Sequence, residues 1–229
     1  MTRRLLAKKP FDMSARVPMQ LGRESISSST VAVSESIKNS YDADAEDVKI
    51  QFHLRHKPAL SSIVLKDDGN GMGIETLYSH WLKIGTDSKL GIEHSLVKRR
   101  VMTGAKGLGR LGLDRLCQKV ILYTKTEGTD KVIQLIVDWR KYESTNASIF
   151  DIKHEVYELD LPVNDKYGDI FTSQEDKGTY MVLIGLRDNW DKSFLDTLKE
   201  ELRLLISPYR AANDFTIEWR CHKKNEKPV

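Results

Sequence analysis

The chain has 229 residues, of which 40% are hydrophobic and 30% are charged. This length and composition suit a protein that buries a substantial core in one large domain or in one and a half. The formal net charge of +3 is too small to indicate nucleic-acid binding by itself.

Cysteine usage and hydropathy indicate the cellular setting. Cys117 and Cys221 have neither metal-type spacing nor a paired framework, which is typical of a reducing cytosol. No apolar run approaches the roughly 18 residues needed to cross a bilayer. The basic start MTRRLLAKKP lacks the apolar core and cleavage site of a signal peptide. The sequence therefore predicts a cytoplasmic protein that does not contact a membrane.

The N-terminal part of the chain leads into a predicted helix. Residues 1–13 are expected to form a flexible basic arm, and residues 14–22 a short packed segment. The serine and threonine residues at 27–30 are N-cap candidates for a helix that runs to about Tyr41.

Three polar side chains share one face of this predicted helix. Glu35, Asn39 and Asp42 stand at positions i, i+4 and i+7, which lie within a narrow arc. The opposite face is expected to pack on a sheet through Val33, Ile37 and Tyr41. By itself this pattern also fits the solvated face of an ordinary amphipathic helix.

A second polar group follows a pair of predicted strands. Residues 48–54 alternate between apolar and polar, and residues 62–66 form a second strand that runs directly into DDGNGMG at 67–73, followed by a short helix at 74–81. Glycine permits the positive φ of a sharp turn and lets a flat ring approach the backbone. Asp67, an acceptor at the end of a buried strand, suits an exocyclic amino group such as that of adenine. A simple Asp-Gly turn is the alternative.

A third, glycine-rich stretch lies at the end of a long polar segment. The segment at 84–106 has little periodicity, which is typical of a functional or disordered loop. Gly104, Gly107 and Gly109 precede a helix expected to run to about Cys117, an arrangement that presents backbone N–H groups to phosphate. It fits neither a Rossmann crossover nor a P-loop. Two basic residues in this stretch, Lys106 and Arg110, either add charge at the phosphates or are solvated.

The rest of the chain contains more strands and one further helix. The expected elements are a hairpin at 119–126 and 131–139, an irregular strand at 149–161, an exposed loop at 162–177, an apolar strand at 178–184, a helix at 193–206, a strand at 215–219, and a polar tail at 221–229 that begins a truncated downstream region.

Read in order, these stretches resemble the GHKL superfamily of ATPases, which includes DNA gyrase B, the heat-shock chaperone of about ninety kilodaltons, histidine kinases and MutL. The resemblance covers roughly residues 14–219 and is most similar to prokaryotic stand-alone and microrchidia (MORC) members. It implies the α+β Bergerat fold, a two-layer sandwich with a mixed, mostly antiparallel sheet, here an ATP-binding domain at 14–220 with a lid at about 84–106. The motifs that carry it are Glu35-x-x-x-Asn39-x-x-Asp42-Ala43, Asp67-x-Gly69-x-Gly71-Met72, Gly104-x-x-Gly107-x-Gly109 and Gly178-Thr179.

The resemblance also implies roles for individual residues. Asn39 would hold Mg²⁺, which prefers few protein ligands beside water and phosphate oxygens. Glu35 would activate the attacking water as general base, and Asp42 would act through water near the adenine. Asp67 would accept a hydrogen bond from the adenine amino group, and Thr179 would support it through a hydroxyl and a water. The nucleotide-binding set is completed by Gly69, Gly71, Met72, Lys106, Gly107, Leu108 and Gly109.

The predicted function is an Mg²⁺-dependent ATPase module whose lid closure drives dimerisation of a larger protein. ATP and ADP are the expected ligands, and DNA or another protein is an expected partner through downstream domains. Asp68 stands where relatives often carry Asn, so Asp67 is chosen as the base-reading residue by its spacing to the glycines. Nothing encodes the basic residue that relatives supply from a following domain, so turnover is expected to be slow. The alternatives are a non-hydrolysing nucleotide switch and a histidine kinase catalytic domain.

Overall fold

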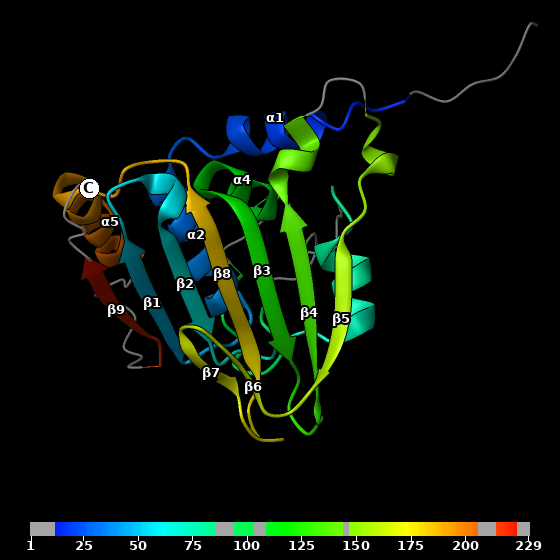
Figure 1. Ribbon diagram of the computed structural model, residues 1–229. Coiled ribbons are helices and arrows are strands. Elements are labelled where there is room, and N and C mark those ends of the chain that lie inside the picture. The colour runs from blue at the N-terminus through cyan, green and yellow to red at the C-terminus, as the bar shows by residue number, and fades with distance from the viewer. Residues whose placement is uncertain (1–11, 86–93, 103–108, 144–146, 206–213, 224–229) are drawn as a thin grey trace, which may run out of the picture.

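The computed structural model describes residues 12–85, 94–102, 109–143, 147–205 and 214–223. Its centre is a seven-stranded sheet in the order β5-β4-β3-β8-β2-β1-β9, with helices on one face (Figure 1). The strands β1 and β9 are parallel, and every other neighbouring pair in this sheet is antiparallel. The predicted α+β sandwich with a mixed, mostly antiparallel sheet is therefore confirmed.

The elements have the following bounds. The strands of the large sheet are β1 (Asp47–Leu54), β2 (Ser62–Asp67), β3 (Cys117–Lys125), β4 (Lys131–Asp138), β5 (Glu155–Asp160), β8 (Gly178–Leu186) and β9 (Thr216–Lys223). The helices are α1 (Val17–Ser25), α2 (Ser29–Asp42), α3 (Ile74–Thr76), α4 (Leu113–Leu116) and α5 (Lys192–Leu205), and the shorter turns are η1 (Pro58–Leu60), η2 (Leu77–Trp81), η3 (Gly109–Gly112), η4 (Trp139–Glu143) and η5 (Ile149–Asp151). Among the described residues, no helix combines the length and the hydropathy needed to span a membrane.

The helix predicted around Glu35 is α2, and it lies against the centre of the sheet (Figure 1). The side chain of Ser28 caps it by accepting a hydrogen bond from the amide of Val31 at 3.1 Å. Val33 and Ile37 are buried in the main core, as the apolar spacing predicts. Because this face packs on the sheet, polar residues of α2 face the neighbouring helices. Thr30 and Ser34, for example, contact Glu201 of α5.

The loop expected at 162–177 is instead a second, two-stranded sheet, and that prediction was wrong. Strands β6 (Val163–Asp165) and β7 (Gly168–Phe171) form a hairpin that lies in front of the large sheet in Figure 1. Ile170 and Phe171 are buried with residues of β2, β3 and β8 in a core separate from that of the helices. Both faces of β8 are thus covered at its centre, which explains its continuous apolar run.

The helix expected to run from Gly109 to Cys117 is shorter than predicted. It is divided into η3 and α4, and Cys117 already begins β3. Gly112 lies where η3 meets α4 and packs closely on the residue after α1, because a Cβ at Gly112 would lie 2.6 Å from the side chain of Ile26. The segment predicted as packed at 14–22 continues into α1 and also approaches η3, because a Cβ at Gly22 would lie 2.4 Å from the carbonyl oxygen of Leu111.

A buried ion-pair network joins α1, α4 and the end of β8. The fully buried carboxylate of Asp114 contacts Nε of Arg23 at 2.8 Å and Nη2 of Arg187 at 2.7 Å. We expect Asp114→Ala to lower the free energy of unfolding by about 3 kcal/mol, because two arginines lose a buried counter-charge. Denaturant titration measures this. The control is Asp138→Ala, whose partner Arg140 is exposed, and its cost should stay within about 1 kcal/mol. Equal losses in the two variants would contradict the prediction.

Candidate functional site

Asp67 closes β2 and lies at the bottom of the candidate site. Its Oδ2 accepts a hydrogen bond from the hydroxyl of Ser40 at 2.7 Å, and its Oδ1 accepts from the backbone amides of Gly69 at 3.1 Å and Thr179 at 3.0 Å. Burial raises the pKa of Asp67, while these three hydrogen bonds oppose the rise. The carboxylate is therefore fixed in orientation by three separate elements.

The neighbouring glycines allow backbone approaches that no side chain would permit. Gly71 has φ +63°, and a Cβ there would lie 1.9 Å from the carbonyl oxygen of Lys125. Gly178 has φ +118°, and its Cβ would lie 2.1 Å from the carbonyl oxygen of Asp67. The turn after β2 is consequently pressed against the ends of β3 and β8, which is the close approach that the sequence pattern indicates.

Several residues of this region are not evident from the sequence motifs. Ser40 directly follows Asn39, yet its contact with Asp67 spans 27 positions. Thr124 of β3 accepts a hydrogen bond from the amide of Met72 at 2.8 Å and donates one to the carbonyl of Gly178 at 3.1 Å. The signal that points to Thr124 is a hydroxyl in a buried strand position, which requires a polar partner.

Thr179 contacts Asp67 through its backbone amide. The hydroxyl role expected for it stays a prediction. Asp67 and Thr179 are directly paired in the register of β2 and β8, and Thr179 is also paired with Thr124 of β3. Three adjacent strands therefore meet at the buried carboxylate.

The polar residues of α2 lie in different environments. Asn39 is exposed, and a Cβ added to Gly109 would lie 3.6 Å from its Nδ2, so the start of η3 is beside this amide. Glu35 is half-buried and forms an ion pair with Lys38 at 2.7 Å. Asp42 is buried, so the predicted polar arc is not uniformly solvated. The helix thus places the amide of Asn39 beside the start of η3.

The rest of the glycine-rich stretch is not described. Lys106, Gly107 and Leu108 lie outside the described residues, as do residues 86–93 and 103–105 of the predicted lid at 84–106. Arg110 donates from Nη2 to the carbonyl of Lys83, which joins η3 to the segment after η2. Burial lowers the pKa of Arg110.

The two adjacent aspartates at the end of β2 differ sharply. Asp67 is buried, whereas Asp68 is exposed and its Oδ1 accepts from the amides of Glu46 and Asp47 at 2.8 and 2.9 Å. Asp68 therefore fixes the connection into β1, and its carboxylate is directed away from the glycine turn.

The donor set on α2 fits a magnesium ion that is held mainly by its substrate. Among the described residues, no group of three or more His, Cys, Asp or Glu side chains is arranged to hold a metal ion. Mg²⁺ takes oxygen ligands in octahedral geometry and commonly keeps waters and phosphate oxygens, with only one or two protein ligands. The exposed Asn39 amide, one turn from Glu35, satisfies that requirement.

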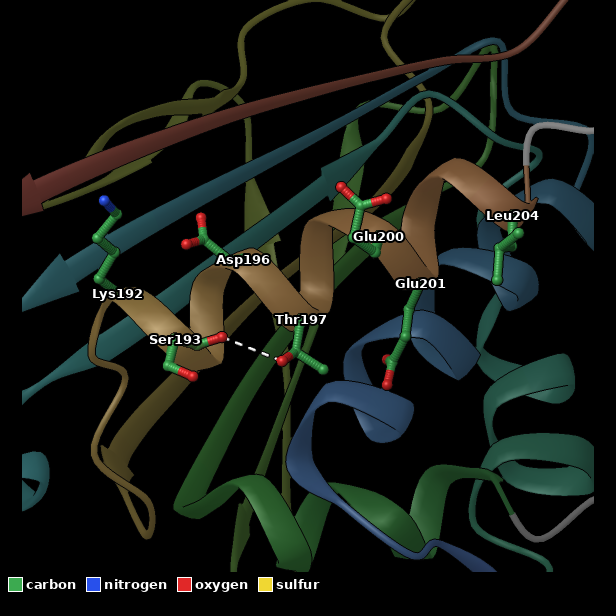
Figure 2. A pocket seen from close by; sticks show the side chains of 7 residues that line it. All are labelled: Lys192, Ser193, Asp196, Thr197, Glu200, Glu201 and Leu204. Atoms are coloured by element: carbon green, nitrogen blue, oxygen red, sulfur yellow. Dashed lines mark hydrogen bonds between the residues drawn. The ribbon is translucent and has the colours of Figure 1, made fainter.

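A separate cavity of about 740 Å³ runs along α5. Figure 2 shows Glu201 pointing toward α2, where its two oxygens accept from the hydroxyls of Thr30 at 2.9 Å and Ser34 at 3.3 Å. Asp196 and Glu200 also line this cavity, and their negative charges would repel a triphosphate, so the cavity does not suit a nucleotide. It is lined by Lys192, Ser193, Asp196, Thr197, Glu200, Glu201 and Leu204.

The fold and the arrangement around Asp67 define an α+β sandwich domain of the Bergerat type. A family model described as "Histidine kinase-, DNA gyrase B-, and HSP90-like ATPase" matches residues 26–166, which is more than half of the chain. The chain belongs to this ATPase family, as the four ordered motifs predict.

Two further similarities concern longer proteins. The chain is 30% identical over 92 residues to a "Putative type II restriction enzyme HgiDII" of Herpetosiphon aurantiacus, a match that covers 40% of this chain and 14% of that protein. It also resembles a solved structure described as "Crystal Structure of N terminal domain of a DNA repair protein" with a TM-score of 0.53 and 18% identity, over 92% of this chain and 54% of that one. The structural likeness supports the fold alone.

Proposed function

We propose that the chain is an ATP-binding and ATP-hydrolysing module that requires Mg²⁺. One observation carries this proposal: Ser40 of α2 donates to the buried Asp67, so a single helix connects the candidate purine site to Asn39 and Glu35. Asp67 would serve the purine end of a bound nucleotide as a hydrogen-bond acceptor. Asn39 and Glu35 would serve its phosphate end.

Each residue has a defined part in this proposal. Asp67 accepts from the adenine amino group while Gly69 and Gly71 let the ring approach the backbone. Asn39 would hold Mg²⁺, and the ion would supply positive charge that offsets the charge of the phosphates. Glu35 orients the attacking water and takes its proton.

The remaining binding residues are assigned from the motifs. Asp42 acts through water near the adenine, Met72 lines the base pocket and Thr179 supports Asp67. The phosphates are contacted by Lys106, Gly107, Leu108 and Gly109. Of this phosphate-binding set the structure describes only Gly109.

The same proposal extends to the larger context of the module. We place the protein in the cytoplasm, and the similarity to a putative type II restriction enzyme favours a role on DNA or in defence. Closure of the lid over ATP would drive dimerisation, which would transmit nucleotide binding to other domains. MORC-like members are the relatives that this proposal favours.

A non-hydrolysing nucleotide switch is the second candidate, and one contact favours it. Nζ of Lys38 lies 2.7 Å from Oε1 of Glu35, so one oxygen of the proposed base is engaged by a cation. Hydrolysis requires that this pair opens or that the other oxygen receives the water proton. A bound phosphate would compete for Lys38 and release Glu35.

The proposed function is tested by calorimetric titration of the chain with ATP in the presence of Mg²⁺ and of EDTA, followed by a phosphate-release assay. We expect saturable binding that weakens about tenfold or more without Mg²⁺, because the ion offsets the phosphate charge, and slow release of phosphate. If the protein binds ATP but releases no phosphate, the result would support the non-hydrolysing nucleotide switch. Absence of ATP binding would contradict both candidates.

A further inference from the structure

Asp44 adopts a backbone conformation that is costly for its residue type. It follows the end of α2 with φ +64°, in the left-handed region. Aspartate tolerates this region better than most residues, but glycine occupies it without strain. Asp44 is nevertheless buried. A buried carboxylate in a position that suits glycine requires a reason in its contacts.

The contacts of Asp44 join two segments that are distant in the sequence. Its Oδ2 accepts from Nδ2 of Asn70 at 3.0 Å and from the amide of Val97 at 2.9 Å, and its Oδ1 accepts from the amide of Lys98 at 3.0 Å. Burial opposes ionisation of this carboxyl, but hydrogen bonds from Ser95, Val97, Lys98 and Asn70 outweigh it and lower the pKa of Asp44. The carboxylate is therefore fully engaged as a charged acceptor.

Asn70 stands between the two glycines of the turn that follows Asp67. Its amide donates to the carbonyl of Ala43 at 2.8 Å, and its side chain donates to Asp44. The turn is thus held from two sides. On one side Gly71 touches the carbonyl of Lys125, and on the other Asn70 is tied to the end of α2.

The second segment, residues 94–101, is a closed turn fastened to the same end of α2. The amide of Ser95 donates to the carbonyl of Arg100 at 2.8 Å, and the amide of Arg100 returns a hydrogen bond to the Ser95 hydroxyl at 2.8 Å. The buried guanidinium of Arg100 donates to the carbonyls of Tyr41 at 3.2 Å and Ala45 at 2.6 Å. Cationic groups stabilise the carbonyl end of a helix, so this placement is favourable.

We propose that Asp44 is a positioning residue that fastens the Asp67–Gly73 turn to the 94–101 segment and thereby sets nucleotide affinity through Asn70. The inference rests on the proposed ATP site and adds a residue that does not touch the ligand. If Asp44 releases Asn70, the support on the α2 side is reduced to the single hydrogen bond from the Asn70 amide to the carbonyl of Ala43. The adenine of ATP would then bind a less ordered turn, and the free-energy cost of ordering this turn would lower the affinity for ATP.

The test uses Asp44→Gly, Asn70→Ala and the double variant, with ATP dissociation constants from calorimetry and unfolding measured separately. Glycine relieves the backbone strain of position 44 while it removes the carboxylate, so the fold should persist. Should Asp44→Gly not fold, Asp44→Asn replaces it, because asparagine tolerates the same φ and lacks one acceptor. We expect about tenfold weaker ATP binding in each single variant, and no further weakening in the double variant, because both single variants remove the same contact between Asp44 and Asn70.

The matched control is Glu46→Gln. Glu46 is exposed and pairs with Nζ of Lys98 at 2.7 Å, so it contacts the same segment without reaching Asn70. Its ATP affinity should equal that of the parent. If the parent binds ATP and Asp44→Gly binds it equally well, the inference is overturned while the proposed function stands. If the fold-losses in ATP affinity of the two single variants multiply in the double variant, Asp44 does not act through Asn70. Two independent structural effects would give that result, because their free-energy changes would add. If the parent itself fails to bind ATP, the proposed function fails first.

Discussion

Replacing Glu35 with alanine should abolish phosphate release while leaving ATP affinity close to that of the parent. A positioned general base contributes about 10²- to 10⁴-fold to a reaction rate, so we expect a loss of that order. Binding should persist because Glu35 is assigned to the attacking water, whereas the affinity depends on Asp67, the glycine turn and Mg²⁺. The measurement combines steady-state phosphate release with calorimetric titration of ATP.

Two further variants make this result specific. Glu35→Gln keeps the size of the side chain but cannot take a proton, so it should be as inactive as the alanine variant. Glu200→Gln changes an exposed carboxylate on α5 and should keep the parental rate. A Glu35→Ala protein that releases phosphate at the parental rate would show that the base is another group or that none is needed.

Replacing Asp67 with asparagine should weaken ATP binding by about 100-fold. A hydrogen bond to a charged group contributes about 1.5–3 kcal/mol, or about 10- to 150-fold. The amide oxygen of asparagine can still accept from the backbone amides of Gly69 and Thr179, and its NH₂ group can donate to the Ser40 hydroxyl. That arrangement keeps the fold but presents a donor to the adenine amino group.

The neighbouring aspartate provides a matched control for this variant. Asp68→Asn retains an oxygen for the amides of Glu46 and Asp47, and its side chain is exposed. Its ATP affinity should therefore be unchanged. Equal loss in both variants would mean that the assignment between the two carboxylates is wrong, and unchanged affinity in Asp67→Asn would remove the adenine contact from the proposal.

Local patterns in the sequence were sufficient for the main elements near the site. The helical spacing of Val33 and Ile37 predicts the buried face of α2, and the serines before it predict the cap that Ser28 makes. The alternation at 48–54 predicts β1, and the glycines after Asp67 predict the sharp turn. These features follow from the period of a helix or a strand and from the freedom of glycine, so a few neighbouring residues specify them.

The sequence was less informative where segments have weak periodicity. Residues 163–171 show no regular alternation of apolar and polar side chains and resemble a loop, yet Ile170 and Phe171 bury one face of the large sheet as part of β7. The helix predicted from Gly109 is divided into η3 and α4, and Gly112, at their junction, packs directly on Ile26 of the N-terminal segment. In both cases contact with a distant part of the chain outweighs local propensity.

The sequence by itself determined the family, the α2 helix with Glu35 and Asn39 one turn apart, and the glycine turn after Asp67. Only the tertiary structure decided that Ser40 fixes Asp67, that Asp68 faces away, and that Asp44 joins Asn70 to residues 97 and 98. The physical reason is that periodicity and glycine conformation are local properties of the chain. A hydrogen bond between residues tens of positions apart depends on how the strands and helices pack.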